Sequence, residues 1–179
     1  MKKKLSLTAL SLLLTACLAH AQLGGSTGTS TVSVAVAAEA GLTVTTGTTT
    51  LASTGTNFSS YTSNTGLTYF IRTSPTSGSG SIVLQVTTDF SPSGGPSVGT
   101  PPTTGDALTY NCTVSSPGTA CTGPLTAKTS GTTSVASFGA DAHSALAGNT
   151  ASVSWSLTND PLYKVGTYNA TVTFTISAA

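Results

Sequence analysis

The chain has 179 residues, of which 38% are hydrophobic and only 6% are charged. Beyond the first 21 residues, three basic and five acidic side chains remain, together with a single histidine. Ionisable side chains so few and so scattered exclude a basic surface that binds nucleic acid, and they offer no cluster of groups for acid–base catalysis. We therefore expect a non-enzymatic protein without cofactor or metal.

Residues 1–21 have the three parts of a secretory signal peptide. Residues 2–4 are lysines, residues 5–14 are apolar, and Ala19-His20-Ala21 is a small-x-small cleavage site. We therefore predict cleavage between Ala21 and Gln22, and a mature protein that is secreted, periplasmic or on the cell surface.

A second processing route competes with this one. Residues 14–17, Leu-Thr-Ala-Cys, have the form of a bacterial lipobox, which would make Cys17 a lipid attachment point. Plain secretion is favoured because the site at Ala21 leaves segments of ordinary length. The apolar stretch is short against the ~20 residues of a spanning helix, and no later segment is apolar enough to span a membrane.

Either route leaves Cys112 and Cys121 as a pair. In an oxidising compartment such a close pair predicts a disulfide, which would stabilise the fold by roughly 2–3 kcal/mol. Two free thiols are the alternative. A metal site is disfavoured because two cysteines without a nearby histidine supply too few ligands.

The expected elements follow in chain order. Residues 22–30 are rich in Gly, Ser and Thr and predict a flexible leader, and residues 31–179 suit one domain. Val32, Val34 and Val36 alternate with small residues and predict a first strand over 32–38, which Gly41 ends.

Further alternating runs predict strands at 67–72, 81–88, 107–113, 132–138, 152–157 and 168–177. Trp155 alternates with serines and is expected to anchor the core. Residues 140–147 are the one candidate for a short helix. We therefore predict an all-β fold, an immunoglobulin-like or pilin-like antiparallel two-sheet sandwich of about seven to eight strands.

Loop 89–106 contains four prolines and several glycines, so it cannot be a central strand. Connections of this length are often functional, although a variable surface loop without a partner is the simpler interpretation.

Other chemistry finds little support. Asp141, His143 and Ser144 resemble a catalytic triad only as neighbours in the chain, and a polar loop histidine is favoured. Calcium needs clustered oxygen ligands, but Asp89, Asp106, Asp141 and Asp160 form no Asp-x-Asp motif.

Lysines such as Lys128 or Lys164 could form an isopeptide bond only if buried beside a carboxyl group, so solvated lysines are expected instead.

The stretch Gly166-Thr-Tyr-Asn-Ala-Thr-Val-Thr-Phe-Thr-Ile176 resembles the closing strand of spore coat protein U-like and related fimbrial or pilin-like secreted domains. The opening over 33–45 is also similar to their first strands. The resemblance implies a secreted β-sandwich. Pilins borrow a strand from a neighbouring subunit and carry their disulfide early in the domain. Here the disulfide is central, and the strand count predicts a sandwich that closes by itself.

Two functions are consistent with these observations. The first is a structural or adhesive surface subunit, as in a pilus or matrix, in which the leader and Val32, Val34 and Val36 would act as a donor strand. The second is a monomeric module that binds a glycan or a protein through loop 89–106.

Overall fold

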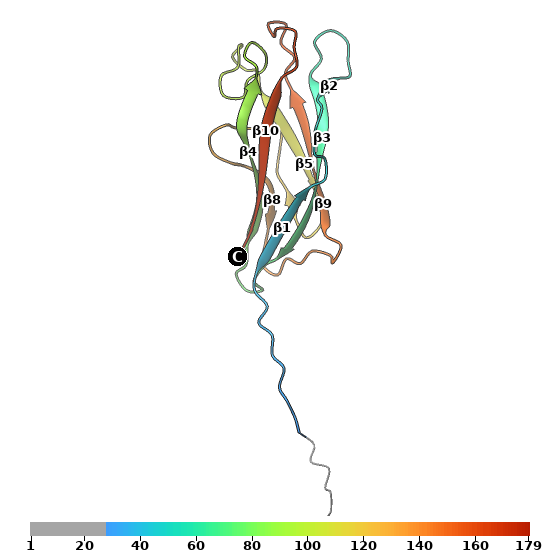
Figure 1. Cartoon of the computed structure of the whole chain (residues 1–179), viewed down its shortest axis with the longest axis vertical. Helices are drawn as coiled ribbons and strands as arrows, with labels where there is room; N and C mark the ends of the chain where they lie inside the picture. The colour runs from blue at the N-terminus through green and yellow to red at the C-terminus, as the bar shows by residue number, and fades with distance from the viewer. Residues whose placement is uncertain (1–27) are drawn as a thin grey trace, which may run out of the picture. The chain divides into compact units, whose positions relative to one another are not determined.

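Alternation of apolar and hydroxyl side chains makes this chain fold as antiparallel strands with one face buried. The computed structural model describes residues 28–179, which include an all-β sandwich of two antiparallel sheets, as predicted (Figure 1). The predicted signal peptide, Cys17 and the predicted cleavage site between Ala21 and Gln22 lie outside the described residues. The strands are β1 (Glu39–Val44), β2 (Ala52–Ser53), β3 (Tyr61–Arg72), β4 (Gly80–Ser91), β5 (Leu108–Val114), β6 (Thr119–Ala120), β7 (Leu125–Thr126), β8 (Thr133–Phe138), β9 (Asn149–Leu157) and β10 (Asn169–Ala178).

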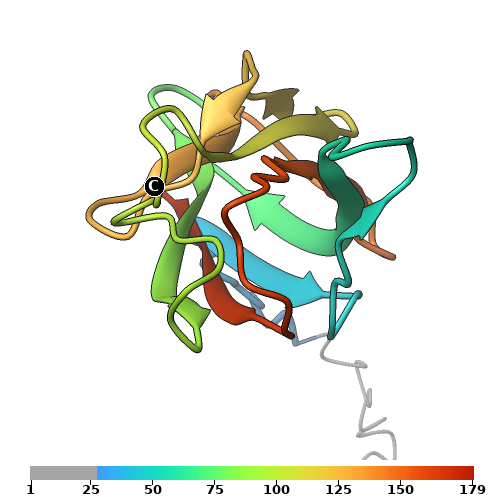
Figure 2. The same cartoon turned by 90° about the horizontal axis from the view of Figure 1, so that it is seen from above.

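The two sheets differ in size. The six-stranded sheet has the order β1-β3-β9-β5-β7, with β2 paired to β3, and the four-stranded sheet has the order β10-β4-β8-β6. All pairs are antiparallel. Figure 2 looks along the sandwich and shows β1 in blue beside β10 in dark red, each at one end of its own sheet.

The core follows the alternation that the sequence predicts. Leu67, Tyr69 and Ile71 of β3 are buried, whereas Phe70 between them is exposed. Trp155 on β9 is 5% exposed, and its indole Nε1 donates a hydrogen bond of 2.8 Å to the hydroxyl of Thr65. The tryptophan is therefore a core anchor, as expected.

Two tyrosines connect the sheets. Tyr69 of β3 packs against Phe138 of β8 with ring centroids 5.1 Å apart. The hydroxyl of Tyr110 on β5 donates a 2.7 Å hydrogen bond to the carbonyl of Ser134 on β8. Burial raises the pKa of both tyrosines, so both hydroxyls stay protonated donors at neutral pH.

The predicted disulfide is confirmed. Cys112 lies on β5 of the larger sheet, and Cys121 directly follows β6 of the smaller sheet. The bond therefore joins the two sheets at the side remote in strand order from β1 and β10.

The prediction of the first strand was wrong in its bounds. Residues 28–38 form no strand, and β1 begins at Glu39 and continues through Gly41. Gly41 lies opposite Phe70 in the ladder, so the glycine does not end the strand. The alternation of Val32, Val34 and Val36 shows only that one side of this segment is apolar. The segment itself pairs with no strand among the described residues.

The segment 140–147, the one candidate for a short helix, forms no helix. Asp141 has a positive φ of 58°, and Ala142 accepts a hydrogen bond from the backbone N–H of Thr73. Backbone bonding to the end of β3 therefore replaces a helical turn. The strand count was low because β2, β6 and β7 have two residues each, too few to give an alternating pattern.

Over residues 28–179, no helix is long and apolar enough to cross a membrane.

Candidate functional site

The inner face of β10 is incompletely covered. Val172, Phe174 and Ile176 lie opposite Val86, Leu84 and Ile82 of β4, so they point to the same inner face. The three residues of β4 are at most 1% exposed, whereas the three of β10 are only half-buried. The alternation of β10 was predicted correctly, but its apolar face was expected to be buried.

The inner face of β1 is open in the same way. Leu42 and Ala40 lie opposite the buried Tyr69 and Ile71 of β3, yet both are only half-buried, and Val44 is 43% exposed. β1 lies beside β10 (Figure 2). We call the incompletely buried inward side chains of the two strands the β1–β10 seam: Ala40, Leu42, Val44, Ala170, Val172, Phe174 and Ile176.

Both strands of the seam have an unpaired edge. Among the described residues β10 pairs with β4 alone, and β1 pairs with β3 alone. β10 is ten residues long and contains no charged residue and no proline, the features that usually protect an edge strand from pairing with another chain. The expectation of a sandwich that closes by itself stays a prediction, because every open sheet ends in an unpaired edge and such an edge does not show that a strand is missing.

Next to the seam in sequence is an unpaired apolar segment. We call residues 22–38 the N-terminal arm, of which 28–38 are described. Val32, Val34 and Val36 are 94%, 84% and 64% exposed, and the described part of the arm has no strand partner.

Loop 89–106 has a different organisation from the one expected. β4 extends through Ser91, so Asp89 belongs to the strand. Its carboxylate accepts hydrogen bonds from the Ser97 hydroxyl at 2.6 Å and from the backbone N–H groups of Val98 and Gly99 at 2.8 and 3.0 Å. Burial acts to raise the pKa of Asp89, but these bonds, with one from the N–H of Phe90, hold it below its ordinary value.

The same loop is packed against Tyr168, the residue that precedes β10. Gly95 and Pro96 are buried, and a Cβ at position 95 would collide with the ring of Tyr168. The Tyr168 hydroxyl donates a 2.7 Å hydrogen bond to the carbonyl of Lys164. The loop is thus a fixed surface rather than a free one, and only a residue without a side chain fits beneath the ring.

Besides Asp89, two more of the four aspartates considered for calcium have hydrogen bonds within the loops. Tyr163 donates a 3.0 Å hydrogen bond to Asp106, and the Thr103 hydroxyl donates one to Asp160. The Thr103 and Leu162 donors hold the pKa of Asp160 below its ordinary value, while burial and the bond to Asp106 raise the pKa of Tyr163. Within residues 28–179, no three acidic, His or Cys side chains group as metal ligands.

Asp160 also forms a turn with the residues that follow it. Its carboxylate accepts a 2.8 Å hydrogen bond from the backbone N–H of Leu162, two residues on, as in an Asx-turn.

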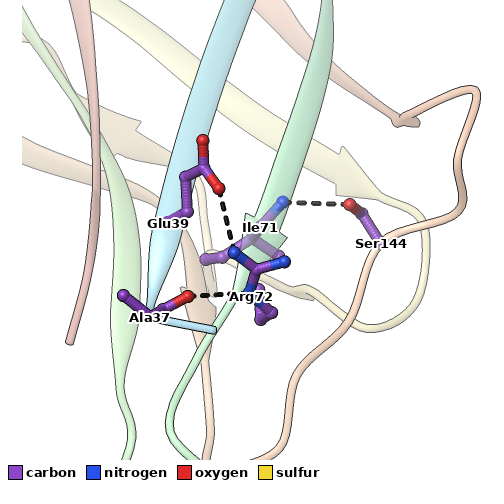
Figure 3. A network of polar contacts seen from close by, with 5 residues as sticks. All are labelled: Ala37, Glu39, Ile71, Arg72 and Ser144. Atoms are coloured by element: carbon purple, nitrogen blue, oxygen red, sulfur yellow. Dashed lines mark hydrogen bonds and ion pairs between the residues drawn. The ribbon is translucent and has the colours of Figure 1, made fainter. Parts of the chain in front are cut away.

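The sequence neighbours Asp141, His143 and Ser144 do not form a triad. His143 Nδ1 lies 3.7 Å from Asp141 Oδ1, but the Ser144 hydroxyl accepts its hydrogen bond from the N–H of Ile71 at 3.0 Å (Figure 3). Among the described residues, no hydrogen bond joins the Ser144 hydroxyl to His143, so the three side chains are not arranged as a triad.

Sequence reasoning missed the neighbouring contacts of Arg72. Its Nη2 lies 2.9 Å from Glu39 Oε2, and its Nε donates a 2.7 Å hydrogen bond to the carbonyl of Ala37 (Figure 3). The signal available was weak: a lone arginine at the end of a predicted strand, 33 residues from the only glutamate.

Both lysines considered for an isopeptide bond, Lys128 and Lys164, are exposed. The solvated interpretation is confirmed for them.

The fold and these contacts define the class of the protein as an antiparallel β-sandwich with an open seam between two unpaired edges. No family model, curated protein or solved structure matches the chain significantly.

Proposed function

We propose that the protein is an exported, non-enzymatic structural subunit whose copies associate by strand addition. The N-terminal arm of one copy occupies the β1–β10 seam of another and supplies an additional strand. The observation that carries this proposal is the half-buried apolar side of β10 at an unprotected edge, in a chain that also has an unpaired segment of alternating valines.

The spacing of the two partners is compatible. Side chains on one face of a strand repeat every two residues, about 6.6–6.8 Å apart. Val32, Val34 and Val36 share this repeat with Val172, Phe174 and Ile176. Complete burial of one valine is worth at most about 1.5–3 kcal/mol, so three in register contribute several kcal/mol before the cost of ordering the arm.

The surface chemistry supports close packing between copies. Residues beyond the signal peptide contain few charges, and the outward side of β10 carries Thr171, Thr173 and Thr175. A hydroxyl-rich surface without like charges does not repel a second copy. Such a subunit fits the surface of a cell or an extracellular matrix, which accords with the predicted export.

The test is a pair of neighbouring substitutions in the arm. Val34→Asp places a charge on the apolar side, and Ser33→Asp places the same charge on the opposite side. The processed wild-type protein and Ser33→Asp should form multimers by light scattering, and Val34→Asp should shift to the mass of one chain. A wild type that is strictly monomeric, or multimers unaffected by Val34→Asp, would overturn the proposal.

A second candidate function is supported by the fixed loop 89–106. The bonds of Asp89 and the contact between Gly95 and Tyr168 give this loop a preformed surface, as a binding module for a glycan or a protein requires. In that case the processed chain is a monomer, and replacing residues 97–103 with a short Gly-Ser linker abolishes ligand capture while the sandwich stays folded.

A further inference from the structure

An open hollow of about 570 Å³ lies over β1 and β3 of the six-stranded sheet, and Ala40 of the seam is among the residues that line it. We call it the outer-face cavity. Its volume is within the ~300–1,000 Å³ typical of small-molecule sites. Its lining includes Glu39 and Gly41 of β1, Phe70 and Arg72 of β3, and His143 and Leu146 of the segment before β9.

The wall of the cavity is held in place by the backbone. Ser144 donates its N–H to the carbonyl of Ile71 at 2.9 Å, and its hydroxyl accepts from the N–H of Ile71 at 3.0 Å. The residue before it, His143, forms an antiparallel bridge with Arg72. Figure 3 shows Ser144 on the other side of β3 from Glu39. The segment that carries His143 and Ser144 is therefore fixed against the end of β3.

An aromatic ring in the cavity is left open to solvent. Phe70 is 41% exposed, although it lies on a strand whose other face is core. Its cross-strand neighbour is Gly41, and Gly148 lies on another side of the ring, where a Cβ would come within 2.9 Å of it. No side chain from either position covers the ring.

Polar groups border this ring. Arg72 is the only arginine of the chain, and His143 is the only histidine among residues 28–179. Both line the cavity together with Glu39. Arg72 is bonded to Ala37 through Nε and to Glu39 through Nη2. Within the described part of the chain, Nη1 of Arg72 and the second carboxylate oxygen of Glu39 have no partner, so both are available to a ligand.

The charges decide the class of ligand. Arg72 is paired with Glu39, and His143 lies next to Asp141, so the cavity has no excess of either sign to select an ion. An open aromatic face attracts the slightly positive C–H groups of an apolar surface, and adjacent planar donors and acceptors suit vicinal hydroxyls. A pyranose ring presents both features.

We propose that the outer-face cavity binds a neutral glycan, with a pyranose stacked on Phe70 and its hydroxyls bonded to Arg72, Glu39 and His143. This site is distinct from loop 89–106, and it adjoins the seam at Ala40 and the N-terminal arm at Ala37, to which Arg72 is bonded. A subunit carrying it would hold saccharide chains along its side.

The experiment uses saturation-transfer difference NMR on the processed full-length protein. The probes are maltohexaose, cellohexaose, mannohexaose and chitohexaose, with an oligogalacturonate of the same length as the anionic comparison. We expect transfer to ring protons of at least one neutral probe. Phe70→Ala should weaken its binding by about tenfold or more, and Phe70→Trp should retain it.

Phe58 provides a matched control, because it is an exposed phenylalanine, 63% accessible, that does not line the cavity. Phe58→Ala should leave binding unchanged. The proposal is overturned if no neutral probe shows transfer, if only the oligogalacturonate does, or if Phe70→Ala binds as well as wild type. Far-UV circular dichroism of each variant confirms that the sandwich is intact, and Phe70→Trp separates loss of the ring from local loosening.

Discussion

Phe174 of β10 lies directly opposite Leu84 of β4 and points to the same inner face, yet Leu84 is completely buried and Phe174 is not. The difference arises because β4 has a neighbour on each side, whereas β10 has one. Part of the Phe174 side chain is therefore accessible at the free edge of β10.

This relationship predicts unequal effects of two truncations. Leu84→Ala removes a fully enclosed side chain and should lower the free energy of unfolding by about 2–5 kcal/mol. In unassembled protein carrying Val34→Asp, Phe174→Ala should cost clearly less, about 1–2 kcal/mol, because the ring is already partly solvated. Urea denaturation measures both, with Thr175→Ala on the outer side of β10 as the control. Equal losses for Leu84→Ala and Phe174→Ala would contradict an open seam.

The disulfide should act through the unfolded chain. Replacing both Cys112 and Cys121 by alanine frees a short loop that joins the two sheets, and we expect a loss of about 2–3 kcal/mol. Thermal and urea unfolding of the double variant measure the loss. The unreduced wild type is the reference, and wild type treated with reductant should approach the variant. Unchanged stability after reduction would contradict a structural role for the bond.

Asp89 predicts a dependence of stability on pH. Because the pKa of Asp89 in the folded protein is below its ordinary value, its contribution is fully present above about pH 4 and is lost as the pH falls through the folded-state pKa. Asp89→Asn should lower the free energy of unfolding by about 1–2 kcal/mol at neutral pH, through loss of bonds to a charged acceptor.

The measurement is the difference in unfolding free energy between wild type and Asp89→Asn at several pH values between neutral and strongly acidic. The difference should shrink as the solution becomes more acidic. Asp141→Asn is the control, since this exposed carboxylate has no such set of backbone donors. A difference that is constant with pH would show that the charge of Asp89 does not hold the loop.

The contact between Gly95 and Tyr168 predicts a local overpacking defect. Gly95→Ala forces the ring of Tyr168 away and should destabilise the loop by about 1–3 kcal/mol. Gly139→Ala is the control, because nothing lies near a Cβ at that position. Limited proteolysis should cut loop 89–106 of Gly95→Ala faster than that of wild type, and the double variant with Tyr168→Ala should regain part of the resistance. If all three resist equally, the glycine is not required by the ring.

The sequence was a good guide where a pattern is local. Alternation on β3, β9 and β10 correctly predicted which side chains face inward, because the period of two is a property of the strand itself. The disulfide and the buried Trp155 were also predicted, the one from spacing and the other from its place among serines.

What the sequence did not show depends on contacts between distant segments. Nothing in the run from 169 to 178 indicates that β10 ends a sheet, since that depends on where β1 and β4 are placed. The outer-face cavity combines Glu39, Phe70 and His143, residues far apart in the chain that only the folded sheet brings together. The alternation of apolar and small residues in the arm predicts a strand, but a strand also requires a second strand with which to pair.

The central claim is that the arm fills the seam, and amide hydrogen exchange on the full-length processed protein tests it most directly. The exchange of residues 170–177 on β10 is compared between wild type and Val34→Asp, with β9 as internal control because it is paired on both sides. We predict slow exchange on β10 in wild type, fast exchange at its free edge in Val34→Asp, and slow exchange on β9 in both. Identical exchange on β10 in the two proteins would contradict strand addition at the seam.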